Sequence, residues 1–159
     1  MPMPQLKDPS LLRQAALVGA RWIDADPETG IAVTDPATGR VIGHVPALGA
    51  AETRDAIDAA EAARHGWAAR TAKERGQVLR RWFDLMMENQ ADLGAILTAE
   101  QGKPLAEAKG EIAYGASFIE WFAEEARRAY GEVTPGHAPD KRIVTIKQPV
   151  GVVAAITPW

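Results

Sequence analysis

The chain has 159 residues, of which 47% are hydrophobic and 25% are charged, as in an ordinary globular domain. Its net charge of −3, with acidic and basic residues interspersed, excludes a basic surface for nucleic acid, so we expect no such partner. The absence of cysteine excludes disulfides, thiolate metal sites and a cysteine nucleophile within these residues. No apolar stretch is long enough to span a bilayer, so we expect a cytoplasmic protein without membrane contact.

The first 46 residues predict a short helix followed by short strands. Residues 1–19 have a polar start and then a helical pattern, with Asp8 or Ser10 as its cap and Pro9 in the first turn. Residues 21–46 contain isolated apolar residues separated by Asp-Pro and Thr-Gly pairs. This pattern is typical of short strands joined by turns.

Helical periodicity then predicts three helices in succession. Apolar residues return at helical spacing over residues 51–67, which indicates the first helix. Thr71 and Glu74 have the spacing of a capping box at the start of the second. The third covers about residues 91–101 and ends at Gly102, which can adopt the left-handed conformation. The predicted buried stripe of the second helix is Leu79, Trp82, Phe83 and Met86.

A fourth and longer helix is predicted over residues 104–130, with two apolar faces. One face is a predicted core seam of seven residues: Leu105, Ala108, Ile112, Gly115, Ile119, Phe122 and Ala126. The other face is aromatic and consists of Tyr114, Phe118 and Trp121. Because so wide an apolar surface needs two neighbours, we expect more protein to lie against this helix.

Two residue types on the fourth helix could carry chemistry. Glu111 projects between its two apolar faces, and a hydrogen-bonded structural role is favoured over acid–base chemistry. From their pattern alone, Tyr114 and Phe118 are predicted to be core residues, with a ligand tunnel as the alternative. No catalytic residue is predicted from these positions.

The last 20 residues predict two further strands. Residues 142–147 alternate and are rich in β-branched residues, which favours an edge or projecting strand. Residues 151–156 are continuously apolar, as in a parallel strand covered on both faces. No helix follows to cover this strand, so we interpret Trp159 as the end of a fragment. Ile156 to Trp159 occupy its carboxyl end, where open α/β sheets bind their ligands.

Motifs for metal ions and phosphates are missing from the sequence. The three histidines, His44, His65 and His137, have no metal-ligand spacing with one another or with carboxylates, so we predict no metal site. Neither a Gly-x-Gly-x-x-Gly motif nor a phosphate loop is present. The usual nucleotide fingerprints therefore do not identify a cofactor.

The carboxyl-terminal sequence closely resembles a known family. Residues 149–159, PVGVVAAITPW, resemble the strand and following turn of aldehyde dehydrogenases, in which an asparagine comes next. Residues 100–108 and 118–125 are similar to the succinate-semialdehyde dehydrogenase branch of that family. The similarity extends from the turn at residues 35–39 to Trp159, so the chain resembles the amino-terminal part of such an enzyme.

The resemblance implies an α/β fold and a division of the chain into three parts. Residues 1–135 would be the helical and β-hairpin lead-in of the cofactor-binding domain. Residues 136–149 would supply part of a projecting oligomerisation arm. Residues 150–159 would form the first strand and turn of the Rossmann-like cofactor domain, and the catalytic domain is not among these residues.

The resemblance also implies particular contacts. In the family, the cofactor is NAD or NADP, and four matching positions contact it, partly through their backbone: Ile156, Thr157, Pro158 and Trp159. The helix that matches Tyr114 and Phe118 borders the aldehyde tunnel. The partners implied are a small aldehyde and further copies of the enzyme, as a dimer or tetramer.

In this family a cysteine thiolate attacks the aldehyde, hydride passes to the nicotinamide, and a glutamate-activated water hydrolyses the thioester. The resemblance thus predicts oxidation of succinate semialdehyde to succinate by the full-length enzyme. The chain alone is predicted to be inactive because it has no cysteine. Two alternatives stay open, namely another small aldehyde such as glutarate semialdehyde, and a non-catalytic oligomerisation module.

Overall fold

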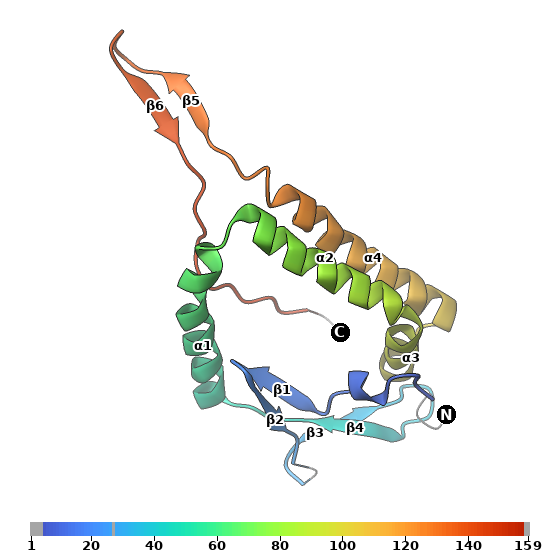
Figure 1. Ribbon diagram of the computed structural model, residues 1–159. Coiled ribbons are helices and arrows are strands. Elements are labelled where there is room, and N and C mark those ends of the chain that lie inside the picture. Colours follow the sequence, from blue (N-terminus) through green and yellow to red (C-terminus); the bar gives the residue numbers. More distant parts are fainter. Residues whose placement is uncertain (1–4, 27, 158–159) are drawn as a thin grey trace.

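The computed structural model describes residues 5–26 and 28–157 and contains helices and antiparallel strand pairs (Figure 1). Two hairpins lie at one side of the molecule, helices α2 and α4 lie at the other, and a third hairpin projects outward. Among the described residues, no helix has an apolar stretch long enough to cross a membrane.

The amino-terminal segment contains only a short 3-10 helix, η1, over Pro9–Leu11. Asp8 caps it by accepting a hydrogen bond from the Ser10 N–H at 2.9 Å. The prediction of Asp8 as a cap is confirmed. The helix ends after one turn, because the chain becomes extended at Leu12.

The predicted helical pattern up to residue 19 is wrong in its second half, where β1 (Ala15–Val18) is a strand. This strand pairs antiparallel with β2 (Arg21–Asp24). Gly19 has φ +61° between them, a conformation that glycine adopts at little cost. Strand pairing across this tight turn, where Val18 lies opposite Arg21, therefore overrides the helical pattern.

The second hairpin consists of β3 (Ile31–Thr34) and β4 (Val41–Val45), so the predicted short strands of this region are confirmed. Asp35 is buried at its turn and accepts hydrogen bonds from the Thr38 hydroxyl and the Ala37 N–H, both at 2.8 Å. The hydrogen bond from the Thr38 hydroxyl, and to a smaller degree the one from the Ala37 N–H, hold the pKa of the Asp35 carboxyl below its usual value.

The first two long helices begin as predicted. Helix α1 (Ala50–Ala68) follows Gly49, and none of its residues is buried. Helix α2 (Ala72–Glu88) starts with a capping box. The Glu74 carboxylate accepts from the Thr71 N–H at 2.8 Å, and the Thr71 hydroxyl accepts from the Glu74 N–H at 3.3 Å.

The buried face of α2 is centred on Gly76, where a Cβ would lie 2.8 Å from the Ala123 carbonyl oxygen. Leu79, Phe83 and Met86 of the predicted stripe are half-buried. Trp82 is 54% exposed, so its assignment to the buried stripe is wrong. At 100° per residue Trp82 lies about 120° away from Gly76 around the helix, beyond the face that contacts α4.

Helix α3 (Gln90–Gln101) ends at Gly102, which has φ +80°, as predicted for a left-handed helix end. Asp92, in the first turn of α3, is buried. Its carboxylate accepts hydrogen bonds from the Lys7 N–H at 3.1 Å and the Asp8 N–H at 2.8 Å. This carboxylate therefore holds the amino-terminal segment against α3.

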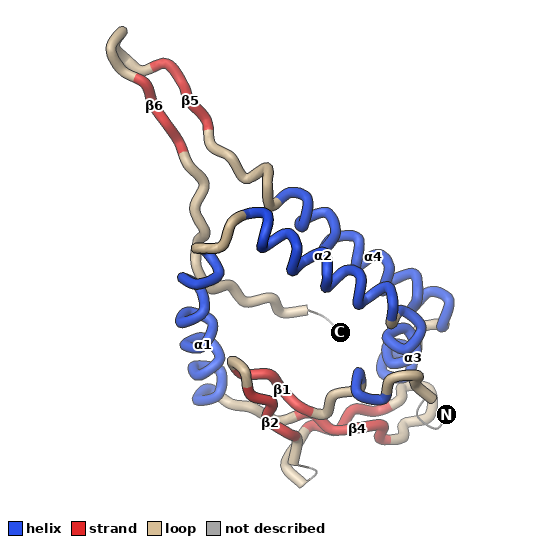
Figure 2. Tube along the Cα trace, viewed as in Figure 1, coloured by secondary structure: helices blue, strands red, loops and turns tan. Residues whose placement is uncertain are grey.

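Helix α4 (Leu105–Glu125) packs against α2 and α3 and ends five residues before the predicted end (Figures 1 and 2). Its buried residues are Ala108, Ala116 and Ala123. The predicted seam is thus correct at Ala108 but wrong at Leu105 and Phe122, which are exposed. Small residues form the contact because α2 approaches closely at Gly76.

Strands β5 (Glu132–Pro135) and β6 (Arg142–Thr145) form the projecting hairpin, and every residue of the two strands is exposed. The predicted strand at residues 142–147 is confirmed as far as Thr145. Strand β5 was missed because its four residues end at a proline and precede a Gly-His turn.

The predicted strand at residues 151–156 is not formed in this chain, where the segment has no regular secondary structure. Val153 is 75% exposed and Ile156 is 97% exposed. A strand needs a neighbouring strand for its hydrogen bonds. The sheets of the described residues are three two-stranded hairpins, and none of them includes this segment.

Candidate functional site

An uncovered aromatic face runs along α4. It consists of the predicted residues Tyr114, Phe118 and Trp121, joined by Phe122 from the predicted seam, and all four are exposed. Tyr114 and Phe118, one helical turn apart, meet edge to face with ring centroids 4.9 Å apart and an interplanar angle of 82°. The structure therefore brings the two predicted tunnel residues together. The prediction from their pattern that they are core residues is wrong among the described residues, since Tyr114 is 66% exposed and Phe118 is 48% exposed.

The second half of the aromatic face lines an open groove on α4. Its lining residues are Ser117, Phe118, Glu120, Trp121, Phe122 and Glu124. The lining combines three aromatic rings with the carboxylates of Glu120 and Glu124, so the groove suits an apolar or weakly polar group better than an anion.

The carboxylate of Glu120 is held by the neighbouring helix. Arg80 of α2 contacts the Glu120 carboxylate at 2.7 Å and the Asp84 carboxylate at 3.4 Å, and its guanidinium lies 4.9 Å from the Phe83 ring centre. These contacts link α2 to α4. Glu120 therefore helps to hold α4 against α2.

Glu111 also forms an ion pair, in this case with Lys103. Lys103 lies in the corner between α3 and α4, and its ammonium reaches the Glu111 carboxylate across the first turns of α4. The prediction that Glu111 is hydrogen-bonded is confirmed. Sequence reasoning missed the partner because the two residues are eight apart, outside the three- or four-residue spacing of helical pairs.

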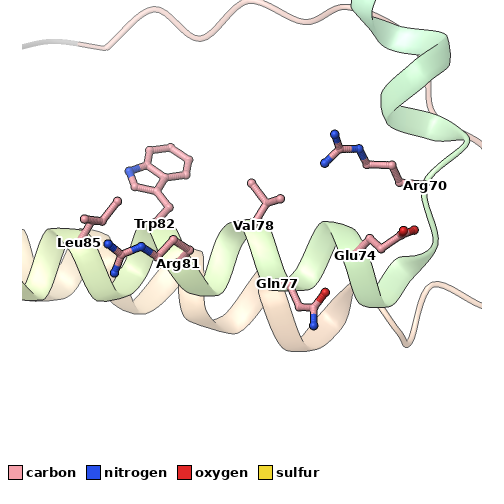
Figure 3. Close-up of a pocket in the computed structure, with 7 residues that line it drawn as sticks. All are labelled: Arg70, Glu74, Gln77, Val78, Arg81, Trp82 and Leu85. Atoms are coloured by element: carbon pink, nitrogen blue, oxygen red, sulfur yellow. The ribbon is translucent and has the colours of Figure 1, made fainter.

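A second groove lies on α2 (Figure 3). It is lined by Arg70, Glu74, Gln77, Val78, Arg81, Trp82 and Leu85. Val78, Trp82 and Leu85 project from the same side of the helix, and Arg70 reaches over its beginning. Sequence reasoning missed this groove because it assigned Trp82 to the core.

The predicted cofactor contacts lie at the carboxyl end of the described chain. Ile156 and Thr157 are exposed, and Pro158 and Trp159 lie outside the described residues. In the view of Figure 1, the segment returns from the projecting hairpin into the space framed by α1 and α2. The near-complete exposure of Ile156 leaves that end of the segment open to a ligand.

Titratable groups elsewhere in the described part of the chain lack the arrangement that a metal site requires. Among residues 5–26 and 28–157, no group of three or more histidines and carboxylates could hold a metal ion. In the last turn of α3, partial burial raises the pKa of the Glu100 carboxyl. The Thr98 hydroxyl nearby is buried without a hydrogen-bond partner.

Known proteins similar to this chain are aldehyde dehydrogenases. The chain is 66% identical over 155 residues to the glutarate-semialdehyde dehydrogenase of Pseudomonas putida. It is 61% identical over 155 residues to the NADP-dependent succinate-semialdehyde dehydrogenase of Escherichia coli. Each alignment covers 98% of this chain and 32% of the relative, so the chain spans about a third of the length of these curated relatives.

Solved structures agree with the sequence comparison. The succinate-semialdehyde dehydrogenase from Burkholderia pseudomallei matches with a TM-score of 0.88 and 59% identity, over 93% of this chain and 31% of that one. The α/β fold predicted from the resemblance, as the amino-terminal part of an aldehyde dehydrogenase, is thereby confirmed. The model of the aldehyde dehydrogenase family matches residues 22–159. The chain therefore belongs to the aldehyde dehydrogenase family.

Proposed function

We propose that the chain is the amino-terminal part of an NAD(P)-dependent dehydrogenase that oxidises succinate semialdehyde to succinate. The observation that carries the proposal is the high identity, over 98% of this chain, to two dehydrogenases named for semialdehydes of short dicarboxylic acids. Glutarate semialdehyde is the second candidate and is supported by the relative named for it, which is 66% identical to this chain, against 61% for the one named for succinate semialdehyde.

The activity is assigned to the full-length enzyme. The chain has no cysteine, so it cannot supply the thiolate on which the family mechanism depends. NAD(P) would accept the hydride there. The 159 residues alone are proposed to be inactive and to contribute part of the cofactor site and one wall of the aldehyde tunnel.

Six residues have proposed roles in these contacts. Ile156, Thr157, Pro158 and Trp159 would contact the dinucleotide, and the exposure of Ile156 is compatible with that role. Tyr114 and Phe118 would border the aldehyde tunnel, where their edge-to-face packing fixes the position of each ring. An apolar wall of this kind suits the methylene chain of a semialdehyde.

The domain boundaries and assembly are proposed on the same grounds. Residues 1–135 would be the lead-in, 136–149 part of the oligomerisation arm, and 150–159 the first strand and turn of the cofactor domain. Because β5 begins at Glu132, the projecting hairpin starts slightly before the proposed arm. We further propose a cytoplasmic homo-oligomer.

The test is an assay of the full-length enzyme with both semialdehydes and a neutral aldehyde such as butanal, each with NAD and with NADP. The proposal expects the highest kcat/KM with succinate semialdehyde. A preference for glutarate semialdehyde would establish the second candidate, and a preference for butanal would contradict both. An independent check is the residue that follows Trp159 in the coding sequence, where the family resemblance expects asparagine.

A further inference from the structure

The Lys103–Glu111 ion pair is distinguished from the other interactions of α4 by its position and burial. The Lys103 side chain is 26% exposed and that of Glu111 is 30% exposed, whereas both partners of the Arg80–Glu120 pair are at least 40% exposed. A less exposed pair is screened less by water and salt. Its two charges therefore have a stronger effect on nearby ligands than those of an exposed pair.

Glu111 lies on the same stripe of α4 as Tyr114 and Phe118. At 100° per residue the three positions fall within about 60° of one another around the helix. Glu111 precedes Tyr114 by three residues, which corresponds to about 4.5 Å along the axis. A ligand that contacts Tyr114 is therefore also close to the carboxylate of Glu111.

A carboxylate in this position creates a difficulty for the proposed substrate. Succinate semialdehyde carries a carboxylate of its own, and two like charges repel within the Debye length, which is about 8 Å at physiological ionic strength. The ammonium of Lys103 removes the difficulty by cancelling the charge of Glu111. The neighbouring carboxylates of Glu120 and Glu125 are paired with Arg80 and Arg128.

We infer that the Lys103–Glu111 pair determines charge selectivity in the wall of the aldehyde tunnel, with Lys103 neutralising a carboxylate that would otherwise repel anionic aldehydes. The inference rests on the proposed function, since it places Tyr114 and Phe118 beside the aldehyde. It goes further by assigning the tolerance for a negatively charged substrate to two residues outside the catalytic centre. Lys103 acts on the substrate through Glu111, so it is a positioning residue.

The test compares an anionic and a neutral aldehyde in variants of the full-length enzyme. Lys103→Gln exposes the substrate to the charge of Glu111, so KM for succinate semialdehyde should rise about two- to fivefold while that for butanal stays unchanged. Glu111→Gln leaves the ammonium alone and should lower KM for the anionic aldehyde. Both changes should shrink in 1 M salt, where the Debye length is about 3 Å, because the two side chains are still partly exposed and salt ions reach them.

Three further variants separate this inference from a structural effect. The double variant Lys103→Gln with Glu111→Gln should return KM for succinate semialdehyde close to that of the parent, and Lys103→Arg should preserve it because the charge is kept. Glu107→Gln is the matched control. Glu107 is exposed, on the same stripe and seven residues before Tyr114, about 10.5 Å along the axis, so its removal should change KM little.

The outcomes distinguish this inference from the proposed function. If the parent enzyme oxidises no semialdehyde, the proposed function fails and this inference fails with it. If the parent is active but Lys103→Gln changes kcat/KM equally for both aldehydes, the pair is merely structural and only this inference is overturned. An effect of Glu107→Gln as large as that of Glu111→Gln would overturn it as well.

Discussion

The layer of α2, α3 and α4 differs from the segment after Gly131 in what covers its apolar residues. Within the layer the helices approach one another at small residues, as at Gly76 against the Ala123 carbonyl. In the later segment the apolar side chains of Val133, Val144 and Ile156 are exposed. The contact faces of the first region are matched to neighbours within this chain, whereas the aromatic face of α4 is exposed. The second has the composition of a packed structure but no cover among the described residues.

The difference teaches that apolar composition alone does not identify a core. The run Val152 to Ile156 is more continuously apolar than any stretch of α2, yet it remains exposed, whereas α4 buries its contact face with alanines. Burial requires a partner of matching shape. The relatives, which are about three times longer than this chain, have the additional residues from which such a partner could come.

The largest expected effect comes from breaking the close approach in the helical layer. Gly76→Val places a Cβ 2.8 Å from a backbone carbonyl that cannot rotate away, so α2 and α4 must separate. We expect a loss of about 3 kcal/mol in the free energy of opening this layer. Hydrogen exchange of the α2 and α4 amides in the full-length enzyme measures that loss.

The matched control for this change is Gly66→Ala in α1, where a Cβ would meet nothing within 4 Å. Alanine is the better helix former, so α1 should be stabilised by up to about 1 kcal/mol. Equal exchange behaviour of the two variants would show that the layer is not held together by its small residues.

A smaller effect is expected at the buried carboxylate of α3. Asp92→Ala leaves the Lys7 and Asp8 N–H groups without their acceptor, at a cost of about 2 kcal/mol. Exchange of these two amides should accelerate while the α2 amides keep their protection. The control is Asp84→Ala, which removes only an exposed pair with Arg80 and should cost less than about 0.5 kcal/mol.

Local signals in the sequence were sufficient to predict the helical layer. The capping box at Thr71 and Glu74 and the glycine at the end of α3 each depend on residues within one helical turn. Their physical effect is local, so sequence alone predicts it. The predictions failed where tertiary contacts decide, as for Trp82, whose side of α2 depends on where α4 packs.

The candidate site could be predicted only in part, for the same reason. Periodicity placed Tyr114 and Phe118 on one face, and their ring contact agrees with that. The Lys103 partner of Glu111 was not predictable, because the conformation of the corner before α4 determines where the ammonium lies. The resemblance alone suggested the cofactor contacts, and their geometry remains a prediction.

The third-largest effect is expected at the capping box of α2, where the stability of the start of the helix should also depend on pH. Thr71→Ala should destabilise the start of α2 by about 1 kcal/mol. The hydroxyl and N–H of Thr71 hold the pKa of Glu74 below its ordinary value of 4.5. A carboxyl whose pKa is lower in the folded than in the unfolded protein stabilises the fold fully at a pH above its unfolded-state pKa. It loses that contribution as the pH falls through its folded-state pKa.

The difference in helix stability between the parent and Thr71→Ala should therefore be largest at neutral pH and should shrink below about pH 4.5. Amide protection in the first turns of α2, converted to opening free energies at each pH, measures it. A difference that grows on acidification would mean that the carboxylate does not contribute to the cap.

The smallest effect tests the comparison between the two regions directly. Val153→Ser changes a side chain that is 75% exposed. The helical content of the 159-residue chain should therefore stay unchanged, and its free energy of unfolding should change by less than about 0.5 kcal/mol. The same substitution in the full-length enzyme should cost about 1 to 3 kcal/mol, because we propose that residues 151–156 form a strand covered on both faces there. Thermal unfolding of both proteins, with and without the substitution, separates the cases. An unchanged melting temperature in the full-length enzyme would contradict the proposed strand, because the segment would then be exposed there as well.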